Sequence, residues 1–300
     1  MLDTFEVDYT TLLASLKALN SSRNELLFTK FLPTGYQLTT LSSVSDHLFD
    51  PVISTKIRIG TLITLYDDFA DHPKMRDIEL LRQLYKIPFS GIESNSNHPA
   101  IRLASDLWKR VILSIQKFPN YKYLEQVFEF DVQQFYNANR YAELVSDNPY
   151  LANQRENRIY SPHNMGIIVA ATIDLMASEN LDFKELGRIR DFFHRAQDIA
   201  RIMNVITTLD REVADNDVTG EIAAALLERG HLQGDRVPIS EQVKATDFYT
   251  PIIQELSTEQ DDLFLNLRAK SPSIRTFDVD KYIKGLRALN HLHETMKGQI

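Results

Sequence analysis

A run of aspartates stands out in the segment 66–71, which reads YDDFAD. Asp67 and Asp71 are four residues apart, so on a helix their carboxylates stand one above the other, with Asp68 beside them. Like charges at this spacing repel each other, and a helix C-terminus disfavours anions further. A divalent cation would relieve the repulsion, and carboxylate oxygens suit Mg2+. The alternative is an acidic helix end that is exposed to solvent.

A second polar cluster lies in the segment 204–212, which reads NVITTLDRE. Asn204, Thr208 and Glu212 follow one another at intervals of four, so their side chains form one polar stripe along a helix. Amide, hydroxyl and carboxylate oxygens are again ligands that suit Mg2+. Arg201 precedes the stripe by one turn, and Arg211 lies at its end. The alternative, an exposed face with an Arg–Glu pair, is disfavoured by the apolar residues around the stripe.

The elements that must position these clusters are expected to be helices. Only 10 glycines and 11 prolines interrupt the 300 residues, which favours long elements. Apolar residues recur at three- and four-residue intervals, and no strand pattern is present. Helices are expected over 55–71, 103–114, 121–145, 186–203, 251–270 and 278–297. The breaks between them are too short for domain linkers, so the pattern predicts a single-domain all-α barrel or bundle of about ten or more helices over residues 1–300.

Composition and charge narrow the class of function. The net charge of −8 disfavours nucleic-acid binding, although metal ions could still bring an anionic ligand to the chain. Because there is no cysteine, disulfides, thiolate metal sites and cysteine nucleophiles are excluded. The N-terminal segment lacks the pattern of a signal peptide, and the most apolar run, 165–177, falls short of the roughly 18 residues of a membrane span. We therefore expect a cytoplasmic protein that is not an integral membrane protein.

Together, the two clusters resemble the two metal motifs of class I terpene synthases, the terpene cyclases of bacterial type. The segment 67–71 looks like the aspartate-rich DDxxD motif of that family. Asn204, Thr208 and Glu212 look like its second motif, in which an Asn or Asp is followed by a Ser or Thr four residues on and a Glu eight residues on. Chain length, expected helix number and motif order agree, so the resemblance covers essentially the whole chain. The first motif alone is shared with prenyltransferases.

Several arginines resemble diphosphate-binding positions of the family. Arg158 resembles the arginine with which bacterial members sense the diphosphate, and Arg201 and Arg211 look like the basic positions flanking the second motif. Arg287 could stand for the arginine of a C-terminal Arg-Tyr pair. The chain departs from the family where no tyrosine follows Arg287, no Asp-Gly pair closely follows Arg158, and Val205 replaces an acidic residue.

The resemblance implies a lyase that ionises an allylic isoprenyl diphosphate, with Mg2+ ions, three in this family, bridging the diphosphate to both motifs. Geranylgeranyl diphosphate, farnesyl diphosphate or a bicyclic diterpenyl diphosphate would be the substrate, and a terpene hydrocarbon or alcohol the product. Three aromatic residues near the motifs are candidates for pocket walls: Tyr66, Phe69 and Tyr160. Aromatic residues at helical spacing more often belong to an ordinary core. The resemblance also allows a homodimer.

Two alternatives remain open. A trans-prenyltransferase of the same fold needs two aspartate-rich motifs, and the stripe Asn204, Thr208 and Glu212 does not provide the second. A non-catalytic helical scaffold is disfavoured because both clusters and Arg158 are intact. A cyclase that begins by protonation would require a DxDD-type acid, which the sequence lacks.

Overall fold

The structure is a computed structural model that describes residues 6–21, 23–70, 75–90, 98–215, 217, 219–232, 249–271 and 273–298. Its elements, in chain order, are α1 (Tyr9–Ala18), a π-helical turn η1 (Leu27–Phe31), α2 (Leu32–Thr39), η2 (Asp46–Leu48), α3 (Phe49–Ala70), α4 (Ile78–Leu84), α5 (Ile87–Ser90), α6 (Pro99–Ile115), α7 (Tyr121–Asp147), η3 (Pro149–Leu151), α8 (Gln154–Tyr160), η4 (Ser161–Met165), α9 (Ile167–Met176), η5 (Phe183–Glu185), α10 (Leu186–Asp215), α11 (Glu221–Glu228), α13 (Tyr249–Ala269) and α14 (Val279–Thr295). Within these ranges no strand forms, and one isolated bridge pairs Val44 with Ser178.

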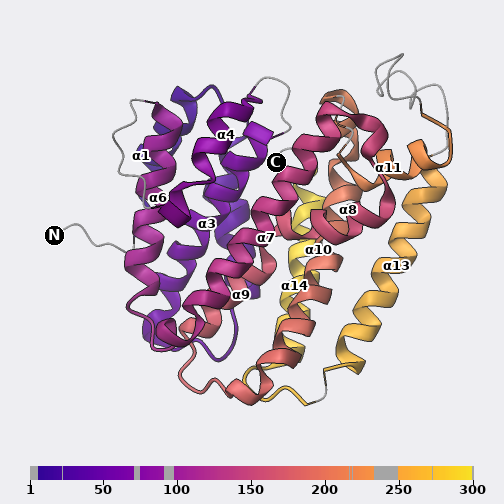
Figure 1. Cartoon of the computed structure of the whole chain (residues 1–300). Helices are drawn as coiled ribbons and strands as arrows, with labels where there is room; N and C mark the ends of the chain where they lie inside the picture. The colour runs from indigo at the N-terminus through magenta and orange to yellow at the C-terminus, as the bar shows by residue number, and fades with distance from the viewer. Residues whose placement is uncertain are drawn as a thin grey trace.

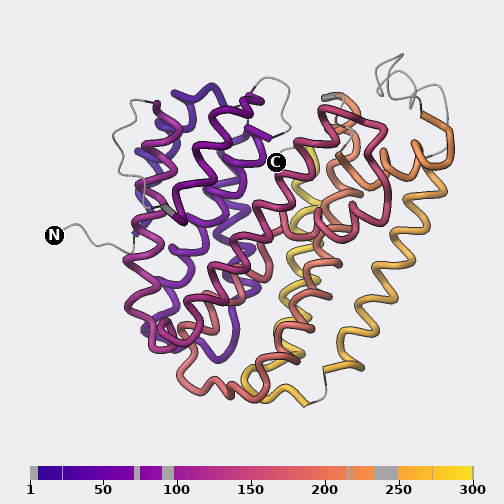
Figure 2. The backbone as a smooth tube through the Cα atoms, in the orientation of Figure 1, coloured from indigo at the N-terminus to yellow at the C-terminus, as the bar shows by residue number. Residues whose placement is uncertain are grey.

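The long helices stand side by side around a buried central helix (Figure 1). Helix α9 contacts α3, α7 and α10, and all ten of its residues are buried, as expected for a helix that is apolar all round. Helix α3 packs against α2 and α6 on one side of the molecule, and α10 packs against α13 and α14 on the other. The last helix, α14, packs on α2 and on α10, and the backbone trace shows α14 running beside α10 (Figure 2).

The expected all-α architecture is confirmed. Each range expected to be helical lies largely within a helix, but several helices are longer than the apolar pattern indicated. Helix α3 begins at Phe49 rather than at residue 55, and α10 continues to Asp215. None of the helices among the described residues is long and apolar enough to cross a membrane.

A buried ion pair holds α3 against α9. Lys56 Nζ donates to the two carboxylate oxygens of Asp174 at 2.9 and 3.1 Å, and to Thr40 Oγ1 at 2.8 Å. The backbone N–H of Leu41 also donates to Asp174 at 3.1 Å. Burial lowers the pKa of Lys56 and raises that of Asp174, and each partner opposes the shift of the other. Because the pair is fully hydrogen-bonded, it can fix the register of these two helices.

Helices α2 and α14 approach each other closely at a glycine. A Cβ atom added at Gly285 would lie 1.9 Å from the carbonyl oxygen of Leu38, which is a backbone atom. No rotation of a side chain can relieve such a clash, so the two helices can take this distance only with glycine at the position. This contact fixes α14, one of the helices that line the cavity described below.

We predict that Gly285→Ala lowers the free energy of unfolding by about 2 kcal/mol or more, because overpacking outweighs the better helix propensity of alanine. Chemical denaturation monitored by circular dichroism measures the effect. Lys284→Ala is the matched control, since Lys284 is exposed on the same helix and its replacement should change stability by less than about 0.5 kcal/mol. Equal stability of Gly285→Ala and the wild type would contradict the close approach.

Candidate active site

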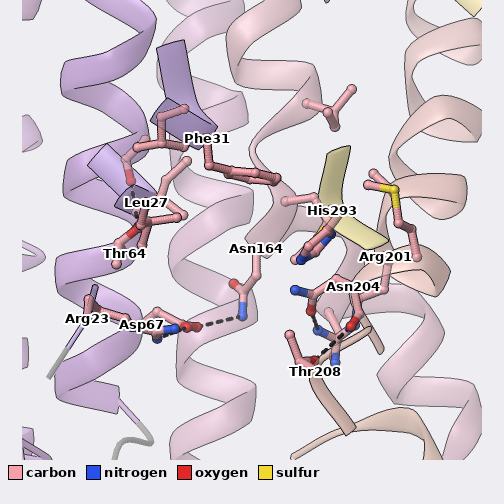
Figure 3. A pocket seen from close by; sticks show the side chains of 18 of the residues that line it. Arg23, Leu27, Phe31, Thr64, Asp67, Asn164, Arg201, Asn204, Thr208 and His293 are labelled. Carbon is pink, nitrogen blue, oxygen red and sulfur yellow. Dashed lines mark hydrogen bonds and ion pairs between the residues drawn. The ribbon is translucent and has the colours of Figure 1, made fainter. Parts of the chain in front are cut away.

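A cavity of about 210 Å3 lies between η1, α2, α3, η4, α10 and α14. Part of its wall is apolar and is formed by Leu27, Phe31, Ile63, Met203 and Leu289, among others. The polar part is formed by Asp67, Asn164, Arg201, Asn204, Thr208, Arg211, Glu212 and Asp217. Figure 3 shows Asp67 on one side of this space and Asn204 and Thr208 on the other. The structure therefore brings parts of both predicted clusters to one cavity.

The first cluster is held by an arginine from the N-terminal part of the chain. Arg23 Nε donates to Asp68 at 2.7 Å, and Arg23 Nη2 donates to Asp67 at 3.3 Å. The side chain of Asp68 is 2% exposed, whereas that of Asp67 is 29% exposed and faces the cavity. Asp68 thus holds Arg23, and Asp67 is the carboxylate of the pair that lines the cavity. Asp71 lies outside the described residues.

Asp67 is only partly neutralised by its neighbours. Burial raises its pKa, Arg23 opposes that rise, and the neighbouring charge of Asp68 adds to it. Across the cavity mouth, Asn164 Nδ2 lies 3.5 Å from Asp67 Oδ1. Asn164 follows α8 in the turn η4 and is itself supported by Asn139 on α7, at 3.3 Å. The carboxylate therefore faces polar groups from elements distant in sequence.

The second cluster forms the predicted stripe on α10. Thr208 Oγ1 donates to Glu212 Oε1 at 2.6 Å and also contacts the carbonyl oxygen of Asn204 at 2.7 Å. Asn204 Oδ1 accepts from Arg201 Nη1 at 3.1 Å. Amide, hydroxyl and carboxylate oxygens thus line the face of α10 that borders the cavity. Helical geometry alone places them together, because they lie at successive turns.

Glu212 lies in a crowded, electronegative corner. Burial and the charge of Asp217 raise its pKa, and Arg201 and the hydrogen bond from Thr208 oppose the rise. Asp217 accepts from both the backbone N–H and the hydroxyl of Thr219, each at 2.7 Å, which fixes its carboxylate just beyond the end of α10. A Cβ atom added at Gly220 would lie 2.5 Å from Glu212 Oε2. A side chain at residue 220 would therefore force the end of Glu212 to move from this position.

Two arginines at the same end of the cavity have unused hydrogen-bond donors. Arg201 Nε and Arg211 Nε are buried and have no acceptor in the described part of the chain. Both residues line the cavity beside Asn204 and Glu212. A buried donor without an acceptor is costly, by about 1–3 kcal/mol or more for a charged group. The arrangement is suited to an anion that accepts from both guanidinium groups.

Two other predicted arginines do not line the cavity. Arg158 on α8 forms ion pairs with Glu221 at 2.7 Å and with Glu259 at 2.9 Å, and it is half exposed. Its guanidinium group thereby joins α8 to α11 and α13. Arg287 is exposed on α14, and its guanidinium carbon lies 4.2 Å from the ring centre of Phe264. Both side chains are engaged on the outer side of their helices.

The three aromatic candidates also lie outside the cavity wall. Tyr66 is buried among Tyr85 and other rings, and its hydroxyl donates to the carbonyl oxygen of Leu84 at 3.2 Å. Phe69 is buried in the main core. The ring of Tyr160 lies 5.3 Å from that of Tyr141, centre to centre, beside a separate apolar cluster. On a helix, a residue adjacent to a site residue faces a different direction.

Several aromatic and polar residues that line the cavity were not predicted from the sequence. Arg23, Phe31, Asn164 and His293 come from four segments that meet only in the folded chain. No spacing in the sequence relates these segments to one another. Phe31 is the last residue of a π-helical turn, a feature that is frequent at functional sites, but the sequence alone does not reveal such a turn.

The oxygen groups of the site fit a hard divalent cation in their chemistry. Asp67 on one side and Asn204, Thr208 and Glu212 on the other supply carboxylate, amide and hydroxyl oxygens, and no soft ligand is among them. Within the described ranges, no group of three or more His, Cys, Asp or Glu side chains is close enough to hold a metal. Amide and hydroxyl ligands would therefore have to contribute.

We predict that Arg23 and Asp68 are strongly coupled in stability. Arg23→Gln alone should cost about 3 kcal/mol, because it leaves a buried carboxylate without its partner. In the double variant Arg23→Gln/Asp68→Asn, the loss in free energy of unfolding should be smaller than the sum of the two single losses by at least about 1 kcal/mol. Urea denaturation measures all three losses. The exposed pair Arg229–Glu255 is the matched control and should show only a small coupling. Additive losses in the first cycle would contradict the buried pair.

No protein-family model and no curated protein sequence matches this chain, whereas solved structures do. Isoprene synthase from grey poplar leaves, in complex with three Mg2+ ions and dimethylallyl-S-thiolodiphosphate, matches with a TM-score of 0.62 at 12% identity, over 95% of this chain and 52% of that one. A second structure of that isoprene synthase matches with a TM-score of 0.59 at 12% identity, over 94% and 51% of the two chains. Linalool/nerolidol synthase from Streptomyces clavuligerus, in complex with 2-fluorogeranyl diphosphate, matches with a TM-score of 0.59 at 13% identity, over 96% of both chains.

The chain thus spans about half the length of the isoprene synthase and nearly all of the linalool/nerolidol synthase. At sequence identities of 12% and 13%, these structures share a fold with this chain, while most of their residues differ. The likeness extends over at least 94% of this chain in each case. The all-α terpene synthase fold expected from the sequence is therefore confirmed.

Proposed function

We propose that this chain, acting as a single domain over residues 1–300, is a Mg2+-dependent terpene synthase of class I. It would ionise an allylic isoprenyl diphosphate and convert the resulting carbocation to a terpene hydrocarbon or alcohol. One observation carries the proposal: charged groups of both signs, some of them without a full set of partners, line a cavity whose remaining wall is apolar. The fold shared with structures of two terpene synthases supports it.

The charges call for a ligand that carries both signs. Glu212 is a buried carboxylate and Asp67 a partly buried one; the pKa of each is raised, and a cation would stabilise the ionised form of both. Arg201 and Arg211 are guanidinium groups with buried donors that an anion would satisfy. Ion pairs between these carboxylates and these arginines could have satisfied both kinds of group. The Nε atoms of Arg201 and Arg211 nevertheless have no acceptor among the described residues. A diphosphate bound together with divalent cations supplies both partners.

The proposed metal-binding residues are Asp67 on α3 and Asn204, Thr208 and Glu212 on α10, with Asp71 added from the sequence pattern. We propose three Mg2+ ions, the number in the isoprene synthase complex. Bound Mg2+ would stabilise the negative charge that develops on the diphosphate as it leaves. Asp68 would act indirectly, since its carboxylate holds Arg23.

The protein's own groups would assist the ionisation in two ways. As the carbon–oxygen bond breaks, its electron pair leaves with the diphosphate, and Arg201 and Arg211 would donate hydrogen bonds to the diphosphate oxygens. The apolar wall, which includes Phe31, Met203 and Leu289, would surround the hydrocarbon chain and exclude water that could capture the cation. The ring of Phe31 offers a π face to the positive charge.

The substrate class is proposed to be a linear isoprenyl diphosphate, farnesyl or geranylgeranyl diphosphate, or a bicyclic diterpenyl diphosphate. A smaller void of about 80 Å3 shares Phe31, Tyr36 and Leu289 with the cavity and reaches Gly35 and Tyr282. Rotation of the shared side chains would join the two spaces and lengthen the room available to an apolar chain. The linalool/nerolidol synthase complex contains a geranyl diphosphate analogue, so geranyl diphosphate belongs in the test as well.

We predict Mg2+-dependent release of diphosphate from at least one of geranyl, farnesyl and geranylgeranyl diphosphate, with a terpene in the organic phase by gas chromatography. Glu212→Gln should reduce this release by about 100-fold or more, because the variant retains the shape of the side chain but loses its charge. Asp262→Asn, on the exposed face of α13, is the matched control and should behave as the wild type. Circular dichroism verifies that both variants are folded.

The other outcomes separate the alternatives. A longer diphosphate that forms only when isopentenyl diphosphate is added would identify a prenyltransferase instead. Full activity of Glu212→Gln would remove the α10 stripe from the site. Absence of turnover with every linear diphosphate and with a bicyclic diterpenyl diphosphate would leave a non-catalytic scaffold of the same fold.

A further inference from the structure

A histidine that the proposed ionisation does not use lines the cavity, close to Phe31 and to Thr207 on α10. His293 is on α14, and its side chain is 6% exposed. Its ring lies 5.1 Å from that of Phe31, centre to centre, and its Nε2 lies 3.2 Å from Thr207 Oγ1 on α10. Figure 3 shows the imidazole between Phe31 and Asn204, among the side chains that line the cavity. It is therefore placed where the hydrocarbon part of a substrate would lie.

The hydrogen-bond network assigns the proton of this imidazole to Nε2. Thr207 Oγ1 is 2.9 Å from the carbonyl oxygen of Met203 and 3.1 Å from that of Asn204, and carbonyl oxygens can only accept. The single hydroxyl hydrogen of Thr207 is thus used, and its oxygen must accept from His293 Nε2–H. Burial, and to a lesser extent Arg211, lowers the pKa of His293 to about 4, so the ring is neutral near pH 7. Nδ1 consequently carries a free lone pair.

This lone pair has no donor within the described part of the protein. His293 Nδ1 is buried and without a hydrogen-bond partner, which is uncommon for a polar atom in a folded protein. The side chains of Phe31, Met203 and Leu289, which also line the cavity, are apolar and cannot donate a hydrogen bond to Nδ1. A buried acceptor beside an apolar cavity costs stability unless a ligand or reaction uses it.

We propose that Nδ1 of His293 is the base that ends the reaction by removing a proton from the carbon next to the carbocation. This assignment rests on the proposed function. The carbon–hydrogen bond breaks, its electron pair forms the carbon–carbon double bond of the product, and the proton binds Nδ1 to give an imidazolium. The imidazolium then passes this proton to the departing diphosphate or to water, since Arg211 disfavours a second positive charge nearby.

His293 suits this step better than the other titratable groups of the cavity wall. Asp67 and Glu212 are proposed to hold the metal ions, and Asp217 is engaged with Thr219. The phenol of Tyr36 is buried, which raises its pKa and keeps it protonated. A carbocation is so strong an acid that even a weakly basic imidazole can accept its proton. The position of the base therefore matters more than its strength.

The proposal is tested with His293→Phe, which preserves an aromatic ring of similar volume and removes the lone pair. His291→Phe is the matched control, because His291 lies on the same helix with its side chain 78% exposed. Ionisation precedes deprotonation, so diphosphate release by His293→Phe should stay within about threefold of the wild type. The share of the main wild-type olefin should fall by about tenfold, with alcohols or other olefin isomers in its place. His291→Phe should keep the wild-type product pattern.

A second variant, His293→Gln, keeps a polar group that can bond to Thr207 and should show the same change of products if His293→Phe does not fold. An unchanged olefin share in a folded, active variant would overturn the assignment. So would a wild-type product that consists of alcohol alone, since no carbon loses a proton on that route. If the wild type itself releases no diphosphate from any substrate, the proposed function fails first, and this result is distinct from failure of the base.

Discussion

The structure depends on holding several carboxylates together at one end of a buried cavity. Asp67, Asp68, Glu212 and Asp217 repel one another there, and burial makes their charges costlier still. Arg23 compensates the first pair, with Asp68 as its main partner. No comparable ion pair compensates Glu212 among the described residues, so its corner is the point at which an added cation would stabilise the protein most.

A rigid helical frame makes this charged arrangement tolerable. The close contact of α14 with α2 at Gly285 and the buried pair of Lys56 and Asp174 fix the helices on both sides of the cavity. The frame keeps the polar groups of α3 and α10 apart, so that they face a shared space without collapsing onto each other. The apolar part of the wall includes Phe31, whose ring lies 5.1 Å from that of His293. In the proposal, the charged groups serve the ionisation and His293 serves the removal of the proton.

Local features of the sequence predicted the helices and the polar stripe on α10. The stripe on α10 was predictable because residues at intervals of four share a helix face whatever the tertiary packing. Arg23, Asn164 and His293 were not, since three distant segments bring them to the cavity and no periodicity relates them. Arg158 and Arg287 were predicted to bind diphosphate because their positions in the sequence resemble a family pattern. The direction of each side chain, however, depends on neighbours that only the fold brings close: Glu221 for Arg158 and Phe264 for Arg287.

The central claim, that the two clusters bind a metal–diphosphate complex, is tested most directly without turnover. Isothermal titration calorimetry would measure the binding of inorganic diphosphate to the wild type in the presence and absence of Mg2+. The account predicts binding that requires Mg2+ and that is lost in Glu212→Gln but kept in Asp262→Asn. Diphosphate binding that is equally strong without Mg2+, or that survives unchanged in Glu212→Gln, would contradict it.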